Sequence, residues 1–251
     1  MSSRRFGTVA VELEPPLAWL TLSRPRKLNA LDRETLEGIG AAARAIDGEP
    51  AVAVAIVRGE GTDFSAGADL SAAAAVPEEK RMGAIRESAE AGRAAIEAVR
   101  RMRSVTIALV HGRAIGGALL LAAACDLRVV TDDAIFWLPE VDLGIPVGWG
   151  GVPMLVAELG PSLARDLVLT CRRFGAEEAH RVGFASRLVA PDDAERAARE
   201  LGAEIASKPA AALTRSKQQF LDVLEGRPAG RPDADLIVAA LAERGRTQLG
   251  G

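Results

Sequence analysis

The sequence predicts an α/β fold built around a mostly parallel sheet. Apolar runs of strand type alternate with helical segments through the N-terminal half of the chain, and this order indicates βαβ units with right-handed crossovers. Val52–Val57 is apolar throughout and Val105–Val110 nearly so, which is typical of parallel strands buried on both faces. Helices dominate from Val152 onward. We therefore expect a core over residues 1–190 and a C-terminal helical region over residues 191–251.

Local patterns predict the elements at the N-terminus. Thr8–Glu12 and Leu17–Leu22 flank the turn residues Pro15 and Pro16 and predict a β-hairpin. Arg33–Asp47 has apolar residues at helical spacing, and the residue before it, Asp32, suits a helix N-cap.

The later elements are predicted in the same way. Ser71–Met102 is interrupted by Pro77 and predicts a short connection followed by an amphipathic helix. We expect three short strands, at Leu127–Thr131, Ala134–Trp137 and Ser186–Val189, and a last amphipathic helix at Asp233–Arg246. Exposed apolar helices at the end of a chain often mediate assembly, so we expect a homo-oligomer.

Composition and charge exclude several classes of protein. Of 251 residues, 49% are apolar, and the formal net charge is −3. Without a dense basic run or many aromatic residues, we expect no nucleic-acid partner. Two cysteines and two histidines offer neither a disulfide framework nor a zinc ligand set. The N-terminal residues lack the apolar core of a signal peptide, and we expect a cytoplasmic protein with no membrane partner.

The stretch Val105–Asp126 is the most informative part of the chain. A buried strand leads into an Ala- and Leu-rich helix that starts at Gly116 and Gly117 and has no polar side chain before Cys125. No Ser, Thr, Asp or Asn stands at the start of that helix to cap its first N–H groups. Free donors at the positive end of a buried helix suit a ligand oxygen or a developing oxyanion. Tight packing of the glycines is the alternative interpretation.

A second glycine-rich junction, FSAGADL, follows the Val52–Val57 strand. If the two strands are neighbours in a parallel sheet, both junctions lie at one edge and each can aim a backbone N–H at a shared oxygen. The sequence lacks G-x-S-x-G, the P-loop pattern and a G-x-G-x-x-G helix start. Covalent serine catalysis, nucleotide hydrolysis and hydride transfer are therefore disfavoured.

Four motifs, SRPRKLNAL, DFSAGADL, HGRAIGGALLLAAACDLRV and FWLPEVDLGIPVGWGG, occur in an order and spacing that resemble the enoyl-CoA hydratase/isomerase (crotonase) family. The resemblance covers about Thr8–Val189 and, more loosely, the segment KPAAALTRSK. It implies a crotonase (ClpP/crotonase-like) fold of repeated ββα units whose C-terminal helices form a homotrimer or a dimer of trimers. It also implies acyl-CoA thioester substrates, with coenzyme A as part of the substrate, no separate cofactor and no metal.

The resemblance also implies roles for individual residues. By position in the motifs, Ala68 and Gly117 supply the two oxyanion N–H groups. The expected substrate-binding residues, along the coenzyme A path and around the acyl pocket, are Lys27, Leu28, Ala66, Asp69, Leu70, Leu120, Trp137 and Trp149, with Lys217 as a further candidate for the coenzyme A phosphates. A solvated surface position is the alternative for the two lysines, and core packing is the alternative for the two tryptophans.

The chain departs from the hydratase pattern at Leu120. Hydratases of the family resemble one another in placing one glutamate three residues after the oxyanion glycine and another about twenty residues later. Here the first position is Leu120 and the second is Glu140. Hydration normally shares its proton transfers between two carboxylates, whereas one suffices for a 1,3-proton shuttle. The pattern is therefore similar to the Δ3,Δ2-enoyl-CoA isomerase branch.

Alternatives remain for Glu140 and for the activity. Glu140 follows a proline and also fits a helix start or a salt bridge. If it lies among Trp137, Leu120, Ile145 and Trp149, burial should raise its pKa toward that of a useful base. The runner-up activity is hydration of a 2-enoyl-CoA. A catalytically silent acyl-CoA-binding protein is the alternative of another class.

Overall fold

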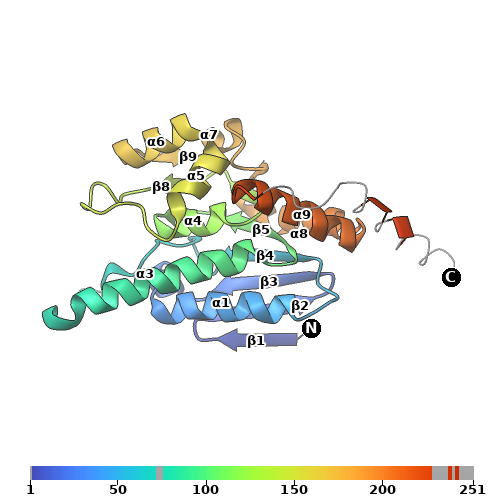
Figure 1. Ribbon diagram of the computed structural model, residues 1–251, viewed down its shortest axis with the longest axis horizontal. Coiled ribbons are helices and arrows are strands. Elements are labelled where there is room, and N and C mark those ends of the chain that lie inside the picture. Colours follow the sequence, from blue (N-terminus) through green and yellow to red (C-terminus); the bar gives the residue numbers. More distant parts are fainter. Residues whose placement is uncertain (1, 72–75, 228–236, 239–240, 243–251) are drawn as a thin grey trace.

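The computed structural model describes residues 2–71, 76–227, 237–238 and 241–242, and the following account is confined to them. Two sheets are present in this part of the chain: one with the strand order β1-β2-β3-β4-β5-β7-β10 and a smaller one with the order β6-β8-β9. Figure 1 shows the N-terminal strands beside α1 and α3, with α5, α6 and α7 at the opposite end of the molecule. None of the described helices is long and apolar enough to cross a membrane.

The large sheet combines an antiparallel edge with a parallel centre. Its strands are β1 Ser2–Phe6, β2 Val9–Glu14, β3 Leu17–Leu22, β4 Val54–Gly59, β5 Val105–Val110, β7 Leu127–Thr131 and β10 Arg187–Val189. The first three pair antiparallel, and β3, β4, β5, β7 and β10 are parallel. The small sheet contains β6 Arg113–Ile115, β8 Ile135–Trp137 and β9 Phe174–Gly175.

Helices cover both faces of the large sheet. They are α1 Arg33–Asp47, α3 Glu78–Arg100, α4 Gly117–Ala123, α5 Gly151–Leu159, α6 Pro161–Thr170, α7 Ala176–Arg181, α8 Ala194–Ala206 and α9 Ala210–Leu224, with short 3₁₀ turns at Pro25–Lys27 and Pro191–Asp193. One face packs on α1, α3 and α4, and the other packs on α8 through Ala198 and Leu201. Alternate residues of the central strands face the two layers, so each strand is apolar on both sides, as its sequence predicts.

Most of the predicted elements are confirmed. The hairpin forms, and α1 and β5 have the predicted bounds. Asp32 caps α1 by accepting hydrogen bonds from the N–H and hydroxyl of Thr35, at 2.9 and 2.7 Å. All of α4 is buried. Both cysteines are buried and free.

Some predicted boundaries are wrong. Strand β6, between β5 and α4, was not predicted, and it forms because Arg113–Ile115 pairs with β8. The strand predicted at Val52 starts at Val54, since the N–H of Val52 closes a turn onto Glu49 O at 3.0 Å. The helix predicted at Asp233–Arg246 lies mostly outside the described residues.

Candidate active site

The two glycine-rich junctions lie against each other. They follow β4 and β5, which are adjacent and parallel with Val54 opposite Val105. Beyond these strands, the N–H of Ser65 donates to Arg113 O at 2.9 Å, and the N–H of Ile115 donates to Ser65 O at 3.2 Å. The expectation that the junctions share one edge of the sheet is confirmed.

The same loop is held on its other side by the residues before α1. Leu31 N–H donates to Gly67 O at 2.8 Å, and Asp69 N–H donates to Leu31 O at 3.1 Å. These two hydrogen bonds form a parallel β-bridge between Leu31 and Ala68 in which the N–H of Ala68 does not take part. Among the described residues, this N–H has no acceptor. Ala68 is exposed.

Gly117 provides the other candidate donor. It is the first residue of α4, so its N–H has no partner within the helix, and no acceptor elsewhere in the described chain takes it. A Cβ built on Gly67 would lie 3.6 Å from the nitrogen of Gly117, which shows how closely the loops approach. The structure thus brings two free backbone donors to one place. Their convergence on a single oxygen stays a prediction.

Glu140 lies directly beside this helix start. Gly116 has a φ of +52° and donates its N–H to Trp137 O at 2.8 Å. A Cβ on Gly116 would lie 2.8 Å from Glu140 Oε1, so the carboxylate packs against the backbone that leads into Gly117. Only a glycine both adopts this φ readily and leaves the space that the carboxylate fills.

The Glu140 carboxylate has no charged partner in the described part of the chain. Its Oε2 is buried and without a hydrogen-bond partner there. Burial raises the pKa of Glu140 above its usual 4.5, although a hydrogen bond from its own backbone N–H lowers the pKa in part. The residue lies in a turn outside the helices and makes no ion pair among these residues, which leaves the salt-bridge and helix-start interpretations without support.

Leu120 fills the position at which a hydratase would carry its other glutamate. Its side chain is 1% exposed. A Cβ on Gly151 at the start of α5 would lie 2.6 Å from Leu120 Cδ2 and 2.9 Å from Val147 Cγ1. Leu120 therefore belongs to an apolar contact between α4 and α5, and that position offers no proton-transfer group.

The two tryptophans are placed differently. Trp149, at φ +55°, lays its indole on Gly117, where any Cβ would overlap the ring. Trp137 donates its Nε1–H to Cys171 O at 2.7 Å, and Arg173 lies 4.6 Å above its ring. The indole N–H of Trp137 is therefore hydrogen-bonded within the protein. Trp137 contributes to the site through its backbone carbonyl, which accepts the N–H of Gly116.

The residues expected along the coenzyme A path are only partly brought together. Leu28 and Ala66 are joined by the hydrogen bond from Ala66 N–H to Leu28 O at 2.8 Å, and Lys27 and Leu70 are exposed nearby in sequence. The Asp69 carboxylate pairs with Arg24 at 3.2 Å, so this side chain anchors its own loop. Its place along the coenzyme A path stays a prediction.

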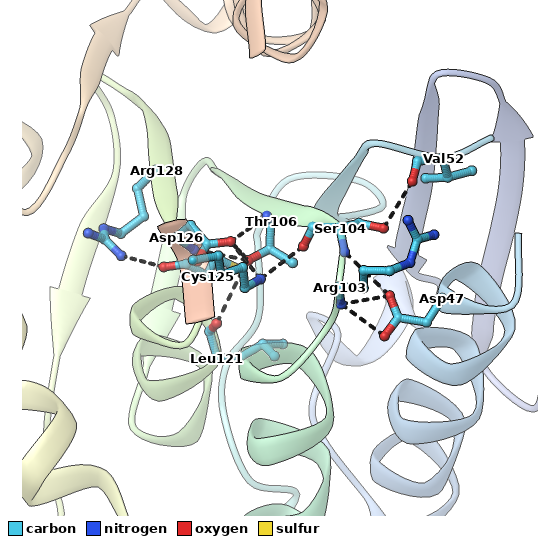
Figure 2. A network of polar contacts seen from close by, with 10 residues as sticks. Asp47, Val52, Arg103, Ser104, Thr106, Leu121, Cys125, Asp126 and Arg128 are labelled. Carbon is cyan, nitrogen blue, oxygen red and sulfur yellow. Dashed lines mark hydrogen bonds and ion pairs between the residues drawn. The ribbon is translucent and has the colours of Figure 1, made fainter. Parts of the chain in front are cut away.

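Lys217 is held by an ion pair and a hydrogen bond within the protein. Its Nζ lies 2.7 Å from Asp126 Oδ2 and donates to Ser104 O at 2.9 Å, and the residue is only 6% exposed. Asp126 Oδ2 also accepts from the N–H and hydroxyl of Thr106, and Figure 2 shows Ser104, Thr106 and Asp126 of this network. Lys217 is on the buried face of α9, where Asp126 neutralises its charge. In this position it serves as an anchor of α9, and the predicted contact with the coenzyme A phosphates stays a prediction.

Other residues that support the site were not predicted as site residues. Asn29, at φ +54°, donates to Glu60 O and Asp63 O at 2.9 and 2.8 Å, and its own carbonyl accepts from Ser65 Oγ at 2.7 Å. Ser65 Oγ in turn accepts from the N–H of Gly67 at 3.1 Å. The signal available in the sequence was the asparagine inside SRPRKLNAL, because asparagine tolerates this backbone conformation better than most residues.

Asp63 clamps the same loop to the β5–β6 turn. Burial acts to raise the pKa of Asp63, but hydrogen bonds from Arg113 and Thr62 outweigh it and hold that pKa below its usual 3.8. Arg113 binds both carboxylate oxygens, and its N–H donates to Oδ1 at 3.0 Å. This pair fixes one glycine-rich loop against the other.

Comparisons with known proteins agree with the resemblance seen in the motifs. A family model described as Enoyl-CoA hydratase/isomerase matches residues 12–232. The crotonyl-CoA hydratase of Syntrophomonas wolfei is 35% identical over 213 residues, which are 84% of this chain and 80% of that protein. The peroxisomal Delta(3,5)-Delta(2,4)-dienoyl-CoA isomerase of Arabidopsis thaliana is 34% identical over 177 residues, 67% of this chain and 64% of that one.

The similarity extends to solved structures. A Thermobifida fusca protein in complex with acetoacetyl-CoA superposes with a TM-score of 0.83 at 29% identity, over 95% of this chain and 94% of that chain. This similarity confirms the expected crotonase fold, with its central sheet and C-terminal helices. The family model spans most of the sequence. The chain belongs to the enoyl-CoA hydratase/isomerase family.

Proposed function

We propose that this protein is an enzyme that moves the double bond of a 3-enoyl-CoA to the 2-position through a thioester enolate. The observation that carries this proposal is the lone acid: Glu140 is half-buried beside Gly116 with its Oε2 buried and without a hydrogen-bond partner among the described residues, while Leu120 fills the position of the other carboxylate with packed methyl groups. Family membership supports the choice of an acyl-CoA thioester as the substrate class.

The reaction requires one base and one oxyanion site. The thioester oxygen accepts hydrogen bonds from the N–H groups of Ala68 and Gly117, which stabilise negative charge as it develops there. Glu140 removes a proton from C2, and the electrons move onto the thioester oxygen. The protonated Glu140 then returns the proton at C4, and the double bond forms between C2 and C3. One oxyanion donor is worth about 3 kcal/mol of activation free energy in comparable sites.

The proposed chemistry needs no cofactor besides the coenzyme A portion of the substrate. Base and donors all come from this chain. We place the coenzyme A along Lys27, Leu28, Ala66 and Leu70. Leu28 O accepts the N–H of Ala66, which brings these segments together, and Lys27 offers an exposed charge to a phosphate. Assembly into a trimer or a dimer of trimers stays a prediction, which light scattering at several concentrations would check.

Hydration of a 2-enoyl-CoA is the second candidate. It is favoured by the relatives, several of which are named hydratases, including those of Syntrophomonas wolfei and Clostridium acetobutylicum. In this chain, hydration would require Glu140 to work with water alone or with a group other than residue 120. The burial of Leu120 against Gly151 is the reason to rank hydration second.

A turnover screen tests these alternatives. Wild type and Glu140→Gln are given 3-enoyl- and 2-enoyl-CoAs of several chain lengths, and products are separated by chromatography. The proposal predicts 2-enoyl-CoA from the 3-enoyl substrates, no product with the variant, and retained acyl-CoA binding by both proteins. Formation of 3-hydroxyacyl-CoA as the main product would support hydration instead. Tight binding without turnover would identify an acyl-CoA-binding protein and refute the proposal.

A further inference from the structure

The Trp149 indole lies between two helices at positions that have no side chain. On one side it covers Gly117, the first residue of α4, and on the other it covers Gly92 of α3. A Cβ at either glycine would overlap the ring, so the two glycines form the slot that the indole occupies. The ring is therefore in direct contact with a residue that supplies an oxyanion donor in the proposed reaction.

The same ring also lines a cleft whose surface is mostly apolar, with charged residues such as Arg93, Glu158 and Lys217 in its wall. It has a volume of about 770 Å³ and lies among α3, α4, α5 and α9. Trp149 and Gly150 form part of its wall, and much of the remaining lining is apolar, including Ile96, Ala123 and Met154. Ala123 is six residues after Gly117 along α4, which places the cleft roughly 9 Å beyond the helix start.

The backbone at Trp149 is held in an uncommon conformation. Its φ of +55° lies in the left-handed region, which bulky residues seldom adopt and which costs on the order of 1 kcal/mol or more. Packing of the indole between Gly92 and Gly117 offsets that cost, so the ring is fixed in its slot. A glycine at residue 149 would adopt the same φ without strain.

The geometry points to Trp149 as the residue that limits the length of the acyl chain. The indole separates the thioester site at Gly117 from the 770 Å³ cleft, so a short acyl chain ends at the ring and a long one has no path into the cleft. This inference rests on the proposed binding of acyl-CoA thioesters at Gly117. It deepens that proposal by naming short-chain acyl groups as the substrate class.

The experiment is a size series at this residue. Trp149→Phe, Trp149→Ala and Trp149→Gly are compared with wild type on 3-hexenoyl- and 3-decenoyl-CoA by kcat/KM, and on the unreactive butyryl- and decanoyl-CoA by calorimetry. Trp149→Gly removes the ring and the backbone strain together, which keeps the series interpretable if Trp149→Ala folds poorly. Phe220→Ala is the matched control, because Phe220 is an aromatic residue that lines the same cleft from α9.

Wild type should prefer the short substrate, and the ratio of kcat/KM for long over short substrate should rise as residue 149 shrinks, by about 100-fold in Trp149→Gly. Phe220→Ala should keep the wild-type ratio. Equal losses for both chain lengths would mark a merely structural residue and overturn the inference, as would a wild type that uses 3-decenoyl-CoA as well as 3-hexenoyl-CoA. The binding data separate this inference from the proposed reaction. If no substrate turns over, the proposed reaction fails. The chain-length role still stands if wild type binds butyryl-CoA far better than decanoyl-CoA and Trp149→Gly removes that difference.

Discussion

Gly116→Ala tests whether the glycine before α4 places the Glu140 carboxylate. The added methyl group would lie 2.8 Å from Glu140 Oε1, well inside van der Waals contact, so the carboxylate must move by several tenths of an ångström. A displacement of 1 Å at a reacting group can cost about 100-fold in rate, so a shift of several tenths should cost about 10-fold. With φ +52° and ψ −119°, Gly116 lies outside the left-handed helical region, so the variant also loses about 1 to 3 kcal/mol of folding free energy through backbone strain.

Gly144→Ala is a control for adding a methyl group to a glycine of positive φ. Gly144 has a φ of +73° in the loop after Glu140, but nothing lies within 4 Å of the place that an added Cβ would take. Urea unfolding should show a loss of about 1 to 3 kcal/mol in each variant from the positive φ. Only Gly116→Ala should lose about 10-fold in kcat/KM. Equal activity losses, or a fully active Gly116→Ala enzyme, would refute the placement argument.

The same residues support three further predictions. Leu120→Glu should raise hydration of 2-enoyl-CoA relative to isomerisation, whereas Leu120→Met should not; product ratios measured by chromatography check this, and an unchanged ratio would contradict it. Because the pKa of Glu140 is raised and the base must be ionised, kcat/KM should fall as the pH drops, with a midpoint above 4.5 in a pH–rate profile. A midpoint at or below that value would mean that Glu140 is solvated. Lys217→Met should cost about 2 kcal/mol of unfolding free energy because it removes the charged hydrogen bond to Ser104 O and the ion pair with Asp126, with acyl-CoA affinity unchanged. Lys27 is exposed, so Lys27→Met should leave the unfolding free energy in urea unchanged and lower the acyl-CoA affinity measured by calorimetry.

Elements with strong local signals can be predicted from the sequence. Helix α1 has both a capping residue, Asp32, and an apolar face, and β5 is a compact β-branched run, so the predicted bounds of each match the structure. The two glycine-rich junctions are predicted to meet because adjacent parallel strands place their carboxyl ends at one edge. The family resemblance of the motifs singles out Glu140 and Leu120, and the structure adds the packing around each of them.

Features that depend on tertiary partners could not be predicted. Strand β6 is three residues long and exists because Arg113–Ile115 finds β8. The charge of Lys217 suggests a surface position, and only the approach of α9 to Asp126 makes it a buried anchor. The role of Trp149 depends on two distant glycines that form its slot, and no pattern in the sequence joins Gly92 to Gly117.

The path of a single proton tests the central claim most directly. A 3-enoyl-CoA carrying deuterium at C2 is converted in ordinary water, and the product is analysed by mass spectrometry and NMR. Because Glu140 Oε2 is buried and has no partner in the described chain, we expect part of the deuterium to appear at C4 of the 2-enoyl product and Glu140→Gln to form no product. Transfer at the wild-type rate in Glu140→Gln would contradict the account.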